Sequence, residues 1–400
     1  MLDRTLRLVL PIFLAAFATA GAFAQKKYDP GATDTEIKIG QTMPYSGPAS
    51  AYGTIGRIET AYFKKLNEEG GINGRKLNLI SLDDGYSPPK TVEMTRRLVE
   101  QDEVLFIFQP LGTAANSAIH KYLNTKKVPQ LFVASGATKW GDPKNFPWTI
   151  GWNHSYQTEG RVYAKDILAR HPNAKIAVLY QNDDYGKDLL KGLKDGLGDK
   201  AKMIVAEASY EVTDPTVDSQ IVALKGSGAD VFVNITTPKF AALAIRKVYD
   251  VGWKPEHYLN NVSLSVGAVL TPAGLDKSVG LITVAYLKDA TDKAWANDPG
   301  MMEYLAFLKK YYPDGNPADS SNVYGYSAAQ ALVQVLKQCG DNLTRENIMK
   351  QAANLKDLQL PLALPGVKIN TSPTDFQTFK QLQLERFDGK QWVPFGQVIH

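Results

Sequence analysis

The sequence predicts an α/β protein of two doubly wound lobes, and three observations lead to that fold class. Between residues 36 and 133, short β-like runs alternate with amphipathic helical stretches, the pattern of a parallel sheet with crossover helices. The alternation restarts after residues 148–152, so we expect a second sheet. The tail from residue 301 differs, with helices followed by strands, and it can complete both lobes if the chain crosses between them more than once.

The first alternation supplies the first lobe. Residues 36–41 are typical of a strand, and the apolar positions from Ile55 onward fall at helical spacing until Gly70-Gly71 ends the helix. The remaining elements expected here are strands at 77–82, 104–108 and 130–133 and helices at 89–101 and 114–126.

The second alternation and the tail follow. We expect a helix at 157–170 that His171-Pro172 stops, and a helix at 238–251 with Pro238 in its first turn, where a missing N–H is tolerated. Between them the expected elements are strands at 175–180, 203–207 and 231–235 and helices at 186–196 and 217–224. The tail adds helices at 301–311, 322–338 and 344–354 and strands at 381–387 and 391–395.

The N-terminus has the pattern of a cleaved secretory signal. Arg4 and Arg7 give a positive start, residues 8–19 form an almost unbroken apolar run, and residues 22–24 read Ala-Phe-Ala, the small-x-small pattern of a cleavage site. The run is too short to span a bilayer as a permanent helix. A buried N-terminal helix would need polar residues at helical spacing within the run, and there are none. We expect export, with cleavage after residue 24 and a mature chain that begins near Gln25.

Composition and charge exclude several kinds of partner. The hydrophobic content of 44% and charged content of 22% are those of an ordinary soluble globular protein. The formal net charge of +4 comes from basic residues spread among similar numbers of acidic ones. Because no basic block appears, we expect no nucleic-acid partner and no membrane insertion.

Cysteine usage fits a soluble periplasmic protein. Cys339 is the single cysteine, so the chain has no intrachain disulfide, and we expect its thiol to pack as a small hydrophobic group before Gly340. A bacterial lipoprotein needs a cysteine at the cleavage site for acylation, whereas Gln25 stands there. We therefore expect a periplasmic protein without a lipid anchor.

Motifs for catalysis, metals or cofactors are missing from the sequence. The five histidines show no metal-ligand spacing, and no HExxH, CxxC, GxSxG or P-loop motif occurs. Residues 196–201 match the dinucleotide-binding string, but they end a helix and are better explained as its C-cap and turn. Asp83-Asp84-Gly85 lacks the later ligands of a calcium loop, so we interpret it as a turn. We therefore expect that the protein is not an enzyme and that it binds no metal or cofactor.

Polar loops of small residues follow three predicted strands, at 42–53, 111–116 and 134–138. In open α/β sheets, ligands bind at the carboxyl ends of strands. Hydroxyl groups and free backbone N–H groups at a helix N-terminus suit a carboxylate or another anion. Thr113 fits such a site, and it fits a plain helix N-cap equally well, because both use the same geometry.

Several segments in collinear order resemble the periplasmic leucine/isoleucine/valine-binding proteins. They are residues 45–53 (YSGPASAYG), 70–77 (GGINGRKL), 83–84 (DD), 128–130 (VPQ), 135–138 (SGAT), 175–180 (KIAVLY) and 185–186 (YG). The resemblance spans essentially the whole mature chain. It implies the solute-binding component of an ABC importer of the branched-chain amino-acid type, with permease and ATPase subunits as partners and a monomeric receptor.

The resemblance also implies an architecture. Members of the family have the type I periplasmic binding fold, a Venus-flytrap of two α/β lobes joined by three crossovers that closes on its ligand. We place the crossovers near Gly151, Ala285 and Leu362. Lobe 1 would then comprise residues 25–150 and 286–362, and lobe 2 would comprise residues 151–285 and 363–400.

By position, the resemblance implies a set of ligand contacts. The carboxylate of the solute would contact Thr113, through its hydroxyl or backbone, and the backbone of Ser135 and Ala137. Aromatic contacts would come from Tyr52 in lobe 1 and Tyr185 in lobe 2, although Tyr185 beside a glycine could simply pack at a strand-to-helix turn. Tyr324 is a further candidate near a third loop.

Val262 departs from the family pattern. Members that bind α-amino acids place an acidic residue at the matching position to pair with the ammonium group, and no acid lies between residues 258 and 274. A buried ammonium without a counter-charge is costly. The solute is therefore expected to be a carboxylate without an amino group, aromatic or aliphatic, unless an acid such as Asp183 or Glu211 reaches the cleft.

Two other functions compete with the transport hypothesis. A ligand-sensing receptor module shares the architecture, but a receptor ectodomain would need a membrane span and a repressor would need a preceding helix-turn-helix. A secreted hydrolase would need a nucleophile and a base converging in the cleft, and the sequence offers no such pair.

Overall fold

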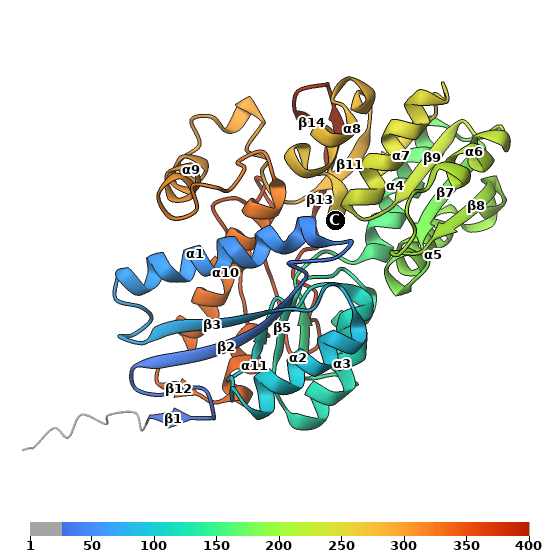
Figure 1. Cartoon of the computed structure of the whole chain (residues 1–400). Helices are drawn as coiled ribbons and strands as arrows, with labels where there is room; N and C mark the ends of the chain where they lie inside the picture. The colour runs from blue at the N-terminus through green and yellow to red at the C-terminus, as the bar shows by residue number, and fades with distance from the viewer. Residues whose placement is uncertain (1–25, 400) are drawn as a thin grey trace, which may run out of the picture.

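Two large β-sheets organise residues 26–399, the part of the chain that this computed structural model describes (Figure 1). Each sheet is covered by helices, so the molecule consists of two α/β lobes. The predicted signal and its cleavage site lie outside the described residues. Within residues 26–399, no helix is both long and apolar enough to cross a membrane.

The sheet of the first lobe has five strands in the order β3-β2-β4-β5-β6, and every neighbouring pair is parallel. The strands are β2 (Glu36–Met43), β3 (Lys76–Asp83), β4 (Ile107–Phe108), β5 (Gln130–Val133) and β6 (Thr149–Gly151). The helices between them are α1 (Gly53–Glu68), α2 (Pro88–Glu100) and α3 (Thr113–Lys126). All four residues of β5 are buried, as expected for a parallel strand covered on both faces.

The sheet of the second lobe has seven strands in the order β14-β13-β11-β10-β9-β7-β8. The parallel strands are β7 (Ile176–Gln181), β8 (Ile204–Tyr210), β9 (Val231–Ile235), β10 (Glu256–Leu259) and β11 (Ile282–Ala285). The helices are α4 (Tyr156–Arg170), α5 (Asp184–Leu197), α6 (Asp218–Gly226), α7 (Pro238–Asp250) and the short α8 (Thr271–Ala273). Strands β10 and β11 were not predicted from the sequence.

The tail serves both lobes. Helices α9 (Pro299–Tyr311) and α10 (Ser320–Cys339) pack against α1, where Tyr304 and Tyr326 join Ile58 in one apolar cluster. Helix α11 (Arg345–Ala352) follows, and β12 (Asn342–Leu343) pairs with β1 (Lys27–Tyr28). The chain then returns to the second sheet as the antiparallel strands β13 (Leu382–Phe387) and β14 (Trp392–Ile399).

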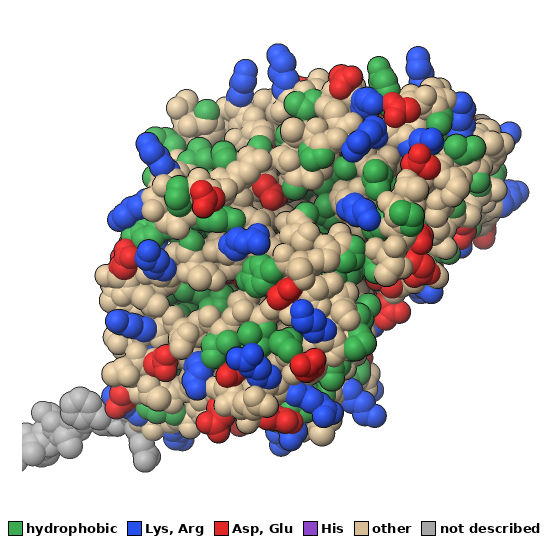
Figure 2. All heavy atoms as spheres, viewed as in Figure 1, with side chains coloured by type: hydrophobic (Ala, Val, Ile, Leu, Met, Phe, Trp, Pro, Cys, Tyr) green, Lys and Arg blue, Asp and Glu red, His purple; other side chains and the backbone are tan. Residues whose placement is uncertain are grey.

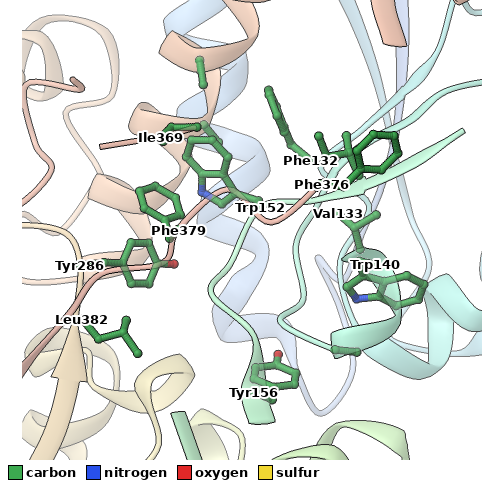
Figure 3. Packing of buried hydrophobic residues seen from close by; sticks show 14 of the residues in the cluster. Phe132, Val133, Trp140, Trp152, Tyr156, Tyr286, Ile369, Phe376, Phe379 and Leu382 are labelled. Atoms are coloured by element: carbon green, nitrogen blue, oxygen red, sulfur yellow. The ribbon is translucent and has the colours of Figure 1, made fainter. Parts of the chain in front are cut away.

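Aromatic side chains pack together where the chain passes between the lobes (Figure 3). Trp152 follows β6, Tyr286 follows β11, and Phe379 precedes β13. The ring of Phe379 lies edge-on to Trp152 at a centroid distance of 5.0 Å and lies 4.4 Å from the ring of Tyr286. We call these three residues the crossover cluster. All three side chains are buried, so the cluster fixes the passes to one another.

Three smaller expectations can be checked on the same structure. The strand predicted at 104–108 is shorter, because only Ile107 and Phe108 pair as a strand, while Leu105 donates its N–H to the Lys38 carbonyl before the strand begins. The dinucleotide-like glycines do end a helix: α5 stops at Leu197, and Gly198 caps it with a φ of 54°. Cys339 is buried at the end of α10, and burial raises the pKa of its thiol to about 12.

Candidate functional site

A cavity lies between the two lobes and is lined by both. The first lobe contributes the N-terminal ends of α1, α3 and α10 and the loops after β3 and β5. The second lobe contributes the N-terminal ends of α4 and α5 and the loops after β9 and β10. The segment that follows β11 and a residue of β13 complete it. The cavity therefore lies at the carboxyl ends of parallel strands, where the sequence placed the site.

The N-terminus of α3 reaches the cavity without a side-chain cap. The N-cap residue is Gly112, at a φ of 97°, and no side chain bonds to the first amide groups of the helix. A Cβ atom at Gly112 would lie 2.6 Å from the Tyr86 ring, so only glycine fits this close approach. Thr113 is the first helical residue, which excludes the simple N-cap role. The partial positive charge of the helix end is left available to an anion.

The hydroxyl group of Thr113 is oriented by its neighbours. Thr113 Oγ1 lies 2.7 Å from Ser135 Oγ. Ser135 Oγ already accepts hydrogen bonds from Trp140 Nε1 at 2.9 Å and from the Ala137 N–H at 3.3 Å. Because a hydroxyl has one proton and two lone pairs, Ser135 must donate its proton to Thr113. The proton of Thr113 then remains free to donate into the cavity, which both Gly112 and Thr113 line.

Ser135 and Ala137 lie behind the main cavity. They line a second cavity instead, together with Arg161 of α4 and residues 375–377. The neighbouring Ala134 lines the main cavity in their place. Of the seven ligand contacts expected from the sequence, these two are the ones that the structure does not bring to the main cavity.

Six tyrosines line the cavity. Tyr52, Tyr185 and Tyr324 were expected from the sequence, whereas Tyr86, Tyr156 and Tyr286 were not. The Tyr185 hydroxyl donates to Asn260 Oδ1 at 2.9 Å, and its ring lies edge-on to that of Tyr156 at 5.2 Å. Burial raises the pKa of all six phenols above the ordinary value, so they are neutral hydrogen-bonding groups with apolar rings.

Val262 lines the second-lobe side of the cavity and is held by the loop around it. The Asn261 N–H donates to Glu159 Oε1 at 2.8 Å, and the Ser263 hydroxyl donates to the Thr236 carbonyl at 2.5 Å. The Val262 carbonyl accepts from the Tyr52 hydroxyl at 3.0 Å. This bond joins the two lobes directly across the cleft.

Further contacts hold the lobes against each other. Ser265 Oγ donates to Asp319 Oδ1 at 2.9 Å, and the Gly267 N–H donates to the Ala318 carbonyl at 2.7 Å. Lys139 and Asp184 form an ion pair of 2.6 Å on another side of the cleft. These contacts join the two lobes on more than one side of the cavity.

Charged side chains line one part of the cavity. Lys288 is tied to Asp298 Oδ2 at 2.7 Å and to the Pro361 carbonyl at 2.8 Å. Asp289 and Glu385 also line the cavity, and both were missed by the sequence analysis. Asp289 comes from the segment after β11 and Glu385 from β13. These two segments are far apart in the sequence and come together only in the folded chain.

The two acids considered from the sequence are absent from the lining. Asp183 caps α5, where its side chain accepts from the Tyr185 and Gly186 N–H groups. Glu211 is exposed and accepts from Asn182. Among the residues that the structure describes, no group of three or more His, Cys, Asp or Glu side chains could hold a metal ion.

Comparison with known proteins identifies the family. The model of the periplasmic binding protein family matches residues 36–391. The chain belongs to this family. Curated relatives of this chain include the Leu/Ile/Val-binding protein homologs 7 and 1 of Brucella abortus (strain 2308). Each is 24% identical over 323 residues; homolog 7 matches 76% of this chain and 77% of its own length, and homolog 1 matches 79% and 82%.

Solved structures share the fold of this periplasmic binding protein at low sequence identity. A branched-chain amino acid ABC transporter protein from Thermus thermophilus with bound valine is 18% identical, with a TM-score of 0.82 over 92% of this chain and 97% of its own. A fatty acid ABC transporter substrate-binding protein from Thermomonospora curvata is 22% identical, with a TM-score of 0.77 over 94% and 95%. The predicted type I fold is confirmed.

The lining residues that sequence analysis missed differ in the signal they carry. Tyr86 follows the strand predicted at 77–82, in a loop that was interpreted only as a turn. Tyr156 and Tyr286 lie outside the three polar loops considered, and Tyr286 comes after β11, a strand that was itself not predicted. A strand assignment for residues 282–285 would have placed its carboxyl end, and so Tyr286, at the cleft of the binding protein. No comparable reasoning would have found Glu385, which lies within β13.

Proposed function

We propose that this protein is the solute-binding component of an ABC importer of the branched-chain amino-acid type, and that it holds a small carboxylate-bearing solute between its lobes. The observation that carries the proposal is the uncapped N-terminus of α3, with the Thr113 hydroxyl beside it, at the wall of the cavity between the lobes. Family membership supports the role in transport. The partners would be the permease and ATPase subunits, which would receive a monomeric, exported receptor.

The carboxylate of the solute would bind at the start of α3. The Thr113 hydroxyl and the first amide groups of the helix are donors, and hydrogen bonds to a charged group contribute about 1.5 to 3 kcal/mol each. The donors are already oriented, because the Ser135 proton fixes the direction of the Thr113 hydroxyl. A preorganised site loses less entropy on binding.

The body of the solute would lie among the tyrosine rings. With Val262 at the position of the usual ammonium partner, the wall there is apolar. The two neighbours named above differ in this respect, since valine carries an α-ammonium group and a fatty acid has none. We favour a carboxylate without an α-amino group, aromatic or aliphatic, because no desolvated ammonium is then left unpaired.

Binding would be coupled to closure of the lobes. The Tyr52–Val262 and Ser265–Asp319 bonds cross the cleft and would be broken in an open form. A solute that touches both lobes adds free energy to the closed form alone and shifts the population toward it. Lobe boundaries at residues 150 and 285 would lie next to Trp152 and Tyr286 of the crossover cluster, and the boundary at residue 362 would precede Phe379.

A thermal-shift screen of the mature protein tests the proposal. The panel comprises branched-chain and aromatic α-amino acids, their deaminated acids, and neutral amides of the same acids. A solute present at 100 times its Kd stabilises the native state by about 2.7 kcal/mol, which raises the melting temperature by several degrees. Carboxylates should shift the melting temperature and their amides should not. A panel in which no carboxylate shifts it would contradict the proposal.

A further inference from the structure

Two acidic side chains share the cavity with Thr113, and within residues 26–399 neither of them forms an ion pair. Glu385 is 6% exposed and Asp289 is 8% exposed, and both line the cavity. Glu385 comes from β13 and Asp289 from the segment after β11, so the passes between the lobes bring the two carboxyl groups into one part of the wall.

The hydrogen bonding of these acids is incomplete. Within residues 26–399, the Glu385 carboxyl makes no hydrogen bond and no ion pair. Asp289 Oδ1 accepts from the Thr291 N–H at 2.7 Å and from its hydroxyl at 2.5 Å, whereas Asp289 Oδ2 is buried without a partner. Lys288, the cation next in sequence, pairs with Asp298 instead. Burial of a carboxylate without a partner is costly, and a protein keeps such a group where something else completes it.

We propose that Glu385 and Asp289 form a cation-binding end of the cavity, opposite in charge to the Thr113 end. This inference rests on the proposed carboxylate site and names its substrate more closely. The solute would carry a carboxylate at one end and an ammonium or guanidinium group remote from it, as in an ω-amino carboxylic acid. Such a molecule needs no acid at Val262, because its cationic group is not attached beside the carboxylate.

The free protein would hold a proton where the cation later binds. Burial, and then the neighbouring Asp289 and Asp292, raise the pKa of Glu385 to about 8, so its carboxyl is largely protonated at neutral pH. Burial likewise raises the pKa of Asp289. The charged and titratable groups around the pair are Lys288, Asp292, Asp298, Asp319 and Tyr286. When the cation enters, the Glu385 proton passes to the buffer and an ion pair forms.

The experiment compares linear ω-amino carboxylic acids of increasing chain length with their des-amino analogues. Each is titrated calorimetrically at pH 7 in two buffers of different ionisation enthalpy, which reveals released protons. We expect one chain length of the amino series to bind at least about tenfold more tightly than its analogue, with proton release for the amino compound alone. Equal affinities without proton release would overturn the inference, while binding of the des-amino acids would still support the carboxylate site.

Variants separate recognition from stability. In Glu385→Gln the preference for the amino compound should fall by roughly ten- to a hundredfold and proton release should disappear, since a charge-assisted bond is removed. Glu93→Gln is the matched control, because Glu93 is exposed on α2 and far from the lining. Asp289→Asn provides a second variant if Glu385→Gln does not fold. An unchanged preference in both Glu385→Gln and Asp289→Asn would overturn the assignment.

Discussion

Ser135 gives its hydroxyl proton to Thr113, because Trp140 and the Ala137 N–H occupy the acceptor positions of Ser135. The two hydroxyl oxygens lie 2.7 Å apart, and this arrangement leaves the Thr113 proton free to be donated into the cavity. If Thr113 binds the solute as proposed, Ser135 is a positioning residue that orients the Thr113 hydroxyl and does not itself contact the solute. We expect the uncapped start of α3 and the Thr113 hydroxyl to act as one set of donors.

Thr113→Val removes that donor. We expect a loss in affinity of roughly ten- to a hundredfold for the tightest carboxylate found by thermal shift, because a hydrogen bond to a charged group contributes about 1.5 to 3 kcal/mol. Calorimetric titration measures it. Thr125→Val on the exposed side of the same helix is the control and should bind normally. Unchanged affinity in Thr113→Val would remove Thr113 from the site.

Val262 is expected to determine the discrimination between α-amino acids and simple acids. The wild-type protein should bind 3-phenylpropionate more tightly than phenylalanine, since the α-ammonium of phenylalanine would be buried without a partner. Val262→Glu should shift the ratio of the two affinities toward phenylalanine by about tenfold or more. Tight binding of leucine or phenylalanine to the wild type, with much weaker binding of the deaminated acid, would contradict this prediction.

Tyr52→Phe tests the closed form. The substitution removes the hydroxyl that bonds to the Val262 carbonyl and keeps the ring. The closed form should lose about 0.5 to 1.5 kcal/mol, so that solute dissociates up to about tenfold faster. Stopped-flow measurements give the rate. Small-angle scattering of the wild type should show a smaller radius of gyration when solute is bound, and identical profiles at saturation would argue against closure.

Glu385 should make stability fall as the pH rises. Its pKa is raised from an ordinary 4.5 to about 8, so between these values the native state binds more protons than the unfolded chain. The stabilising contribution is complete below the unfolded pKa and is lost as the pH approaches the folded pKa, with a slope of at most about 1.4 kcal/mol per pH unit. Chemical denaturation at pH 5.5 and 8 should show a smaller loss in Glu385→Gln than in the wild type or Glu93→Gln. Equal losses would contradict it.

Export gives a prediction that does not depend on the cavity. The intact mass of protein recovered from the periplasm should match a chain that begins at Gln25, because the apolar run and Ala-Phe-Ala direct cleavage after residue 24. Mass spectrometry measures it. A chain that retains Met1 in the periplasm would contradict the predicted processing.

Much of the fold could be predicted because its long helices and first strands have strong periodic patterns. Strands β10 and β11 were missed for a physical reason. Each has four residues, and in a strand buried on both faces no alternation of polar and apolar residues is required. β10 also begins with Glu256 and His257, whose polar side chains mask the apolar pair that follows.

Some residues of the candidate site could likewise be predicted from the sequence, and others could not. Tyr52, Thr113 and Tyr185 follow predicted strands or begin predicted helices, so sequence order places them at the cleft. Asp289 and Glu385 are far apart in sequence, and only the path of the tail brings them together. On the face that Figure 2 shows, Lys and Arg are mixed with Asp and Glu, as their spread along the sequence suggested. The unpaired acids are thus a feature of the interior, which composition does not reveal.

The crossover cluster has a mechanical consequence. Trp152, Tyr286 and Phe379 belong to three different passes of the chain, yet their rings interlock at one point (Figure 3). If each pass bent on its own, the lobes could slide and twist in several directions. If the lobes rotate on binding, as proposed above, the three rings would have to repack together, so we expect the three passes to bend in concert and to favour one direction of motion. The free energy of binding would then drive that motion alone.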